Sequence, residues 1–163
     1  MLKDCYNIVT MIDFEQSLRQ MSEKGQAALC VPAAFKDAGV NVPQKFFIEA
    51  ALRSTMNPEE LARELGLSKI ERGQDIEKVL ESFERLREQG IFIFIRIGGL
   101  TDIGVIGQHL NSITQVEGTR GDKTLVLGGI SPFGKQRGNV FKLDTLKRFI
   151  PKKDGILFFK KEK

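Results

Sequence analysis

The sequence predicts one α+β domain that is helical in its first half and strand-rich and basic in its second. Helix-capping residues and apolar residues at helical spacing recur between positions 44 and 89. A β-branched and aromatic run follows at 91–97, and glycines separate shorter apolar runs after it. Because the helical signals precede the strand signals instead of alternating with them, the pattern favours α+β over α/β.

The length and composition are those of a globular protein with a core of its own. The chain has 163 residues, of which 41% are apolar and 28% charged. We expect a single domain over 1–163, with a core at 44–97 and a basic β-rich extension at 98–163. The apolar run at 91–95 is far shorter than the roughly 20 residues of a membrane span, and no signal-peptide pattern is seen. The expected location is cytoplasmic, with no membrane partner.

The residues that most often carry catalysis or metal binding are few. Cys5 and Cys30 are the only cysteines and His109 is the only histidine. Two distant cysteines are typical of reduced thiols, and one histidine without a close cysteine pair does not make a zinc site. We therefore expect no metal, no cofactor and no catalytic residue. An enzyme is the third-ranked class of function.

The N-terminal part carries weaker signals. Residues 5–11 are predicted as a short strand or an extended lead-in. Asp13 can cap a helix that presents Phe14, Leu18 and Met21 at helical spacing. Gly25 is expected to interrupt that helix, and a short second helix, opened by Pro32, is expected within 27–39.

The helical signals are sharpest between residues 43 and 68. Pro43 is expected to begin a helix that runs to about residue 52. Asn57 is a good N-cap for the next helix, with proline at its first position, and Gly66 suits its C-terminal end. Ser68 with glutamate three residues later matches a capping box, which predicts a further turn of helix there.

A longer amphipathic helix is expected next. Asp75 precedes one continuous helix over 75–89, and Gly90 ends it. Its apolar residues share one stripe of a 3.6-residue period and should be buried together. They are Ile76, Val79, Leu80, Phe83 and Leu86.

The second half is predicted as strands. The run 91–97 lacks an alternating polar face, so it should be an interior strand covered on both sides. Residues 100–116 fit strand and helix about equally. Further strands are expected at 123–127, 140–143 and 155–160, with a turn at 117–122, a glycine-rich loop at 128–138 and one helical turn at 144–149.

The order helix, short helix, longer helix and strand over 44–97 resembles the winged helix-turn-helix domains of bacterial DNA-binding regulators. The phrase ELARELGLS at 60–68 carries the resemblance. It implies that the short helix packs across the longer one through Leu61, Leu65 and Leu67. It also implies groove contacts from residues near the start of the longer helix, namely Lys69, Arg72, Gln74 and Lys78. That helix is acidic, however, so a winged helix used for protein contact is the alternative.

The glycine-rich loop permits three interpretations. Residues 129–135 satisfy G-x-x-x-x-G-K, but Gln136 stands where a phosphate-binding loop needs Ser or Thr. Residues 128–134, GGISPFG, resemble the glycine–proline loop of the aminoacyl-tRNA editing deacylases of the prolyl-synthetase-associated type, which would imply an editing enzyme. A β-turn loop that uses proline and glycine for geometry is favoured over both.

The net charge of +4 is unevenly distributed. Residues 1–100 have a net charge of −2 and residues 101–163 a net charge of +6. Such asymmetry indicates a polyanionic partner for the basic half. The candidate contacts there are Lys135, Arg137, Lys142, Lys147 and Arg148. Phe133, Phe141 and Phe149 lie among them and can either stack on bases or belong to the core, which is favoured.

The leading hypothesis is therefore a regulatory or accessory protein that binds DNA or RNA through a winged-helix-like core and a basic C-terminal half. The alternative is a non-enzymatic adaptor that binds another protein through the helix at 75–89. If nucleic acid binds, reversing the charges of Lys135 and Arg137 should weaken binding more than reversing those of Lys78 and Arg85.

Overall fold

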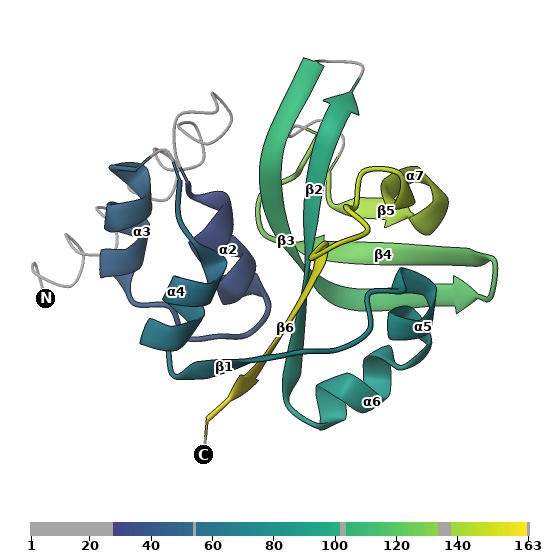
Figure 1. Ribbon diagram of the computed structural model, residues 1–163, viewed down its shortest axis with the longest axis horizontal. Coiled ribbons are helices and arrows are strands. Elements are labelled where there is room, and N and C mark those ends of the chain that lie inside the picture. Colours follow the sequence, from purple (N-terminus) through teal and green to yellow (C-terminus); the bar gives the residue numbers. More distant parts are fainter. Residues whose placement is uncertain (1–27, 54, 102–103, 134–137, 163) are drawn as a thin grey trace, which may run out of the picture.

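The computed structural model describes residues 28–53, 55–101, 104–133 and 138–162 (Figure 1). The strand or lead-in expected at 5–11, the helix expected after Asp13 and the thiol of Cys5 lie outside the described residues. Lys135 and Arg137 also lie outside them.

A six-stranded antiparallel sheet forms the centre of the molecule, in the order β1-β6-β2-β3-β4-β5. Its last strand in sequence, β6, lies between β1 and β2. The strand bounds are β1 Leu67–Ile70, β2 Ile91–Thr101, β3 Gly104–Thr119, β4 Asp122–Gly128, β5 Val140–Lys142 and β6 Ile156–Lys161. This mixed architecture confirms the predicted α+β class.

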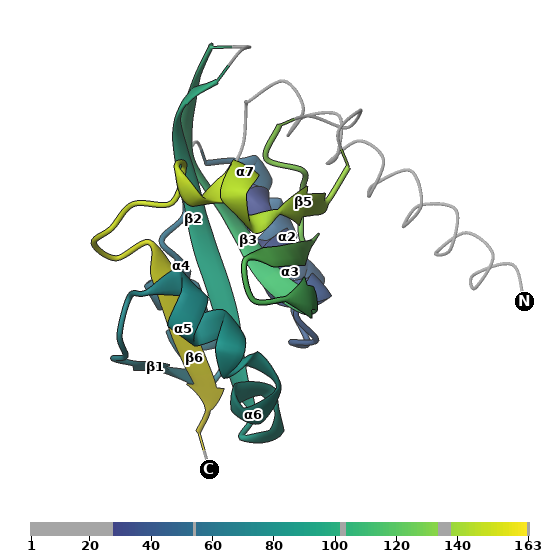
Figure 2. The same ribbon diagram turned by 90° about the vertical axis from the view of Figure 1, so that its right-hand side faces the viewer.

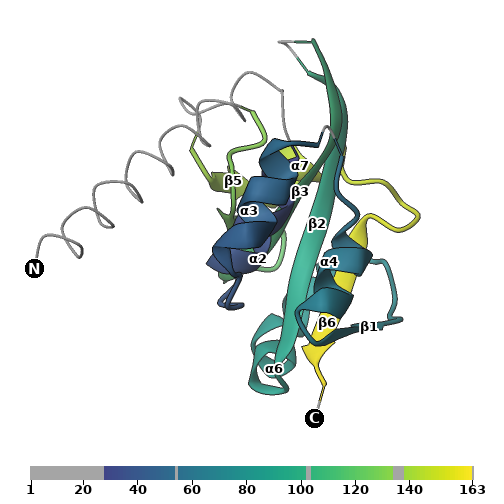
Figure 3. The ribbon, with the colours of Figure 1, turned by 90° about the vertical axis from the view of Figure 1, so that its left-hand side faces the viewer.

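Helices cover both faces of this sheet, so the fold has three layers (Figures 1 and 3). One face carries α2 Cys30–Asp37, α3 Gln44–Ala51 and α4 Pro58–Glu64. The other carries α5 Ile76–Glu81, α6 Phe83–Glu88 and α7 Leu143–Lys147, which Figure 2 shows from their own side. Alternate residues of β2 and β6 point into the two cores, as the two-residue period of a strand requires.

The first core is built around aromatic rings. Phe35 of α2 lies 4.4 Å from Phe94 of β2, measured between ring centroids, and 5.6 Å from Phe159 of β6. All three side chains are fully buried. The second core is mainly aliphatic and joins α5, α6 and α7 to the opposite side of the same strands.

Several local predictions between 57 and 90 are confirmed. The Asn57 side chain accepts a hydrogen bond from the Glu59 amide, which caps α4. Asp75 accepts hydrogen bonds from the first amides of α5. Gly66 and Gly90 both have φ of +76°, the left-handed conformation that glycine adopts at little cost. These signals depend on neighbours in sequence, which explains why they could be read directly.

The continuous helix predicted over 75–89 is wrong. The segment forms two short helices, α5 and α6, separated at Ser82, where φ is −98° and ψ is 6°. The five apolar residues of the predicted stripe are all buried, at 7% exposure or less. The apolar period identified the buried face, but it could not detect a one-residue interruption.

The helical turn predicted from the capping box at Ser68 is also wrong, because this segment is strand β1. Ser68 lies opposite Lys160 of β6 and its hydroxyl donates to the Glu162 carboxylate. Pairing with a strand about ninety residues away therefore outweighs the local capping signal.

The helix packing implied by the winged-helix resemblance is not found. Leu61 of α4 and Leu67 of β1 belong to the first core, together with Phe159. The apolar face of α5 and α6 packs in the second core, on the other side of the sheet. The sheet thus separates the two helical segments that a helix-turn-helix places in contact.

The strand predicted at 91–97 is confirmed as interior. β2 is paired with β6 on one side and β3 on the other, and both its faces are covered. The described residues of the undecided stretch 100–116 belong to the end of β2 and to β3. Leu110 and Ile113, three residues apart, lie in different cores, as an odd spacing on a strand requires.

The far ends of β2 and β3 form a two-stranded arm. Gly99, Leu100 and Thr101 lie opposite Ile106, Val105 and Gly104. β6 pairs with β2 only at 91–95, and β4 pairs with β3 only from Ser112 onward. Within the described residues, the arm therefore projects beyond the neighbouring strands (Figure 1).

Candidate nucleic-acid interface

The structure divides the predicted nucleic-acid contacts into two groups. Lys69 lies on β1, Arg72 and Gln74 lie on the loop before α5, and Lys78 lies on α5. Lys142 ends β5, whereas Lys147 and Arg148 lie at the end of α7. The two groups differ in how much of their charge is available to a partner.

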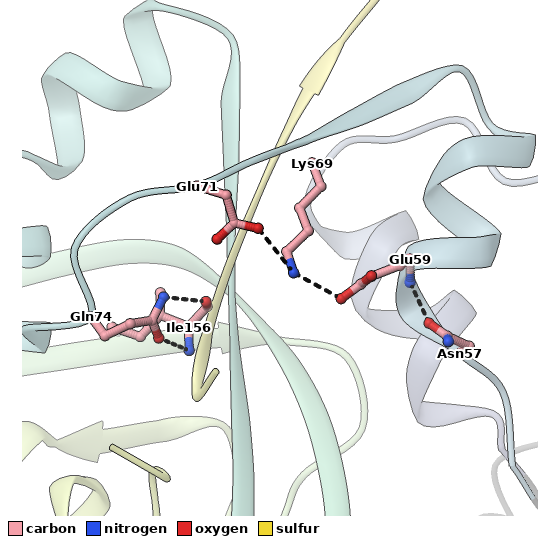
Figure 4. Close-up of polar contacts among 6 residues, drawn as sticks. All are labelled: Asn57, Glu59, Lys69, Glu71, Gln74 and Ile156. Atoms are coloured by element: carbon pink, nitrogen blue, oxygen red, sulfur yellow. Dashed lines mark hydrogen bonds and ion pairs between the residues drawn. The ribbon is translucent and has the colours of Figure 1, made fainter. Parts of the chain in front are cut away.

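Lys69 already forms ion pairs with two acidic neighbours. Its Nζ lies 3.0 Å from Glu59 Oε1 and 3.4 Å from Glu71 Oε1 (Figure 4). The hydrogen bond that Lys69 Nζ donates to the Glu59 carboxylate is the main reason why the pKa of Lys69 is raised. A lysine held between two carboxylates is a poor phosphate contact, because an approaching phosphate must displace or tolerate both acids.

Gln74 has a structural role that the sequence did not reveal. Its amide nitrogen donates to the Ile156 carbonyl at 3.0 Å, and its amide oxygen accepts from the Ile156 amide at 2.9 Å (Figure 4). The Gln74 side chain therefore forms the two main-chain hydrogen bonds that a neighbouring strand would otherwise form with Ile156, at the start of β6. It fixes the loop before α5 and is not available to read a base.

Replacing Gln74 with Ala should lower the free energy of unfolding by about 2 kcal/mol, because two part-buried main-chain groups lose their partner. Gln115, whose amide contacts the exposed Glu117, is the matched control. Its replacement with Ala should cost less than about 0.5 kcal/mol. Chemical denaturation measures both, and equal losses would contradict the structural role of Gln74.

The second group belongs to a set of exposed cations around α7. We call the following five exposed side chains the basic face: Lys142, Lys147, Arg148, Lys152 and Lys153. Residues 135–153 hold seven Lys or Arg and one Asp, a net of +6. Much of the positive charge of the second half is thus concentrated in one short segment.

Buried contacts hold this segment in place. Leu143 and Leu146 of α7 are 5% and 0% exposed. The Phe149 carbonyl accepts a hydrogen bond from the Gly98 amide, which ties the end of α7 to β2. A Cβ on Gly155 would lie 2.0 Å from the Pro151 carbonyl oxygen, so the turn between α7 and β6 is closely packed. The basic face therefore stands on a fixed support.

Acids neutralise only part of the basic face. Lys142 contacts Asp122 at 2.8 Å and Lys147 contacts Glu77 of α5 at 3.2 Å. Both pairs are at least half exposed and contribute little to stability. Lys152 and Lys153 form no ion pair within the part of the chain that the structure describes.

The three phenylalanines among these cations form a packed cluster. Phe133 is 9% exposed, and its ring centroid lies 5.5 Å from that of Phe141 and 5.2 Å from that of Phe149. Arg148 lies over the Phe149 ring at 4.8 Å. The interpretation of these rings as core residues is therefore confirmed for Phe133, and stacking on bases is not supported.

Three polar groups in the described part of the glycine-rich loop form hydrogen bonds within the protein. The Gly129 amide, which a phosphate-binding loop would present to its ligand, donates to the Asp37 carboxylate at 2.7 Å. Asn139 donates to the Gly129 carbonyl and Ser131 donates to the Gly138 carbonyl, so the base of the loop is closed. A carboxylate already at this amide disfavours phosphate there.

His109 supports the same loop. Its Nε2 lies 2.7 Å from the Ile130 carbonyl oxygen, so the neutral ring donates a hydrogen bond through Nε2–H. Asn111, fully buried, donates to the Gly128 and Ile130 carbonyls. Burial lowers the pKa of His109 below its usual value, because desolvation disfavours the imidazolium.

This lowered pKa predicts a pH-dependent stability. Well above the unfolded-state pKa of about 6.5 the histidine is neutral in both the folded and unfolded states. As the pH falls from there toward the lower pKa of the folded state, the unfolded chain takes up a proton first, so stability decreases. Thermal unfolding between about pH 7 and 5.5 should show this loss, and His109→Gln should reduce it. Identical pH profiles for the two proteins would contradict this account.

Cys30 is the remaining candidate group among the described residues. The Cys30 thiol is unpaired, and burial raises its pKa, which disfavours the reactive thiolate. No group of three His, Cys, Asp or Glu suited to a metal ion occurs among the described residues. In the same part of the chain, no helix is long and apolar enough to cross a membrane.

In the described residues the protein is a three-layer α+β fold with a run of exposed cations at 142–153. Comparison of this chain with protein-family models, curated proteins and solved structures found no match.

Proposed function

We propose that this protein is a regulatory or accessory protein that binds the sugar–phosphate backbone of DNA or RNA through the basic face. The observation that carries the proposal is the concentration of five exposed cations in residues 142–153, on α7 and its flanking residues; among the described residues, Lys142 and Lys147 are the two that pair with acids. Non-specific affinity for nucleic acid comes mainly from cations that neutralise phosphates.

The proposal shifts the expected contact away from the winged-helix-like segment. Lys69 and Gln74 are engaged within the protein, and the helices α5 and α6 carry more acids than bases. The aromatic rings near the basic face pack on one another instead of facing outward. We therefore expect contact with phosphates and no strong sequence preference.

The test is the anisotropy of labelled duplex and single-stranded oligonucleotides, titrated with the protein over a range of salt concentrations. If four phosphates are neutralised, affinity should fall about a hundredfold between roughly 50 and 200 mM salt. Different base sequences of equal length should bind similarly. Absence of binding at the lowest salt concentration would overturn the proposal.

Protein binding is the second candidate, and the β2–β3 arm favours it. In this arm, main-chain groups pair across a single hairpin, and each outer edge is left without a strand neighbour in the described residues. An isolated two-stranded hairpin is marginally stable in water, and such an edge can accept a strand from a partner. The adaptor hypothesis predicted the helix at 75–89 as the contact, but Glu77 and Glu81 there pair with Lys147 and Arg120.

A further inference from the structure

Helix α3 has an apolar stripe that nothing in the described part of the chain covers. Ile48 and Leu52 are four residues apart, hence on the same side of the helix, and are 44% and 82% exposed. The opposite side of α3 packs through Phe46 and Ala50 into the protein. Large apolar side chains exposed next to each other on one helix are typical of a docking surface.

A shallow groove extends this stripe toward the start of α4. Leu52 and Met56 supply its apolar part, and the other lining residues are Arg53, Thr55, Asn57 and Glu60. Asn57 caps α4 and so fixes the far side of the groove. The groove lining is more polar than apolar, and Leu52 and Met56 are its apolar part. A lining of this mixed kind suits the boundary between the apolar and polar faces of a short amphipathic helix.

The N-terminal segment reaches the described fold beside this groove. The Ala28 amide donates to the carbonyls of Ala50, at 3.2 Å, and Arg53, at 3.1 Å. Ala28 and Leu29 are buried against Ala50. Ala28, the first described residue, therefore lies at the C-terminal end of α3.

The preceding sequence contains a segment of matching character. Phe14, Leu18 and Met21 have the spacing of one helical face, and six mostly polar residues, SEKGQA at 22–27, link them to Ala28. Six residues span at most about 20 Å. A short link of this kind makes docking an intramolecular event, with an effective concentration that a separate partner rarely matches.

We propose that residues 14–21 dock as an amphipathic helix on the surface formed by Ile48, Leu52 and Met56. The occupant is this chain's own N-terminal segment, because it is apolar on one face and tethered at the edge of the groove. This docking is independent of nucleic-acid binding, since α3 lies on the opposite side of the sheet from α7 (Figures 1 and 2).

The experiment uses four variants of the full chain: Leu18→Glu, Leu52→Glu, the two combined, and Val140→Glu. Val140 is 60% exposed on β5, away from α3, and serves as the matched control. Each of the first two single variants should lower the Tm by about 3 °C. The combined variant should lower it no further than either alone, because both remove the same contact. The control should leave the Tm unchanged.

Trypsin cleavage provides a second measurement on the same proteins. Arg19 lies within the docked segment, so docking should slow cleavage there. Leu52→Glu should accelerate cleavage at Arg19, whereas Val140→Glu should not. Unchanged cleavage and Tm in Leu52→Glu, or additive effects in the combined variant, would overturn the proposal. A Tm loss that depends on protein concentration would identify a second copy as the occupant and would also overturn it.

Discussion

We expect nucleic-acid binding to be abolished when the four cations at and after the end of α7 are reversed. The variant changes four residues to Glu: Lys147, Arg148, Lys152 and Lys153. Each reversal removes one phosphate contact and adds a repulsive charge, so affinity at low salt should fall at least about a hundredfold. The four side chains are exposed, so the fold should be retained. Oligonucleotide anisotropy measures the loss, and circular dichroism checks the fold.

Two control variants make this result specific. Lys78→Glu with Arg85→Glu places the same kind of reversal on α5 and α6 and should change affinity much less. Glu77→Gln should act in the opposite direction, because it frees Lys147 from an acid 3.2 Å away. Affinity and the salt dependence of binding should both increase in that variant. A larger loss from the α5 and α6 reversal would assign the contact to the winged-helix-like segment instead.

Replacing Phe94 with Ala should cost about 4 kcal/mol of stability, the range found for a buried phenylalanine whose cavity cannot collapse. Phe94 is fully buried and contacts the rings of Phe35 and Phe159. Such a loss is a large fraction of the roughly 5–15 kcal/mol that stabilises a typical domain. Denaturant unfolding measures it.

Phe92 provides the comparison within the same strand. It is only partly buried and packs at the margin of the same core. Phe92→Ala should therefore cost clearly less than Phe94→Ala, because part of its surface already faces water. Equal losses would indicate that the two rings contribute equally and that the aromatic core is not centred on Phe94.

The sequence predicted local structure best where the signal residue and the groups that it bonds lie within a few residues of each other. The Asn57 and Asp75 caps and the glycines at 66 and 90 are of this kind. It was misleading at Ser68, whose capping pattern is local but whose strand partner is β6. Capping and strand pairing compete for the same residues, and only the second depends on distant sequence.

The candidate site follows the same rule. The charge excess of the second half led to Lys142, Lys147 and Arg148, because net charge needs no knowledge of the fold. The role of Gln74 could not be predicted, since its partner, Ile156, lies 82 residues away. Nor could the sequence show that Glu59 and Glu71 would lie beside Lys69.

The position of β6 between β1 and β2 has a consequence for folding. β1 and β2 are each paired with β6, which is made about sixty residues or more after them. Until residues 156–161 are in place, β1 lacks its partner and β2 presents an open, apolar edge. Closing such long loops late slows folding and exposes strands that aggregate. A chaperone that covers β2 during synthesis should therefore raise the yield of native protein, and a stop codon before residue 156 should lower it. Both effects should be far larger than the effect of losing a surface helix.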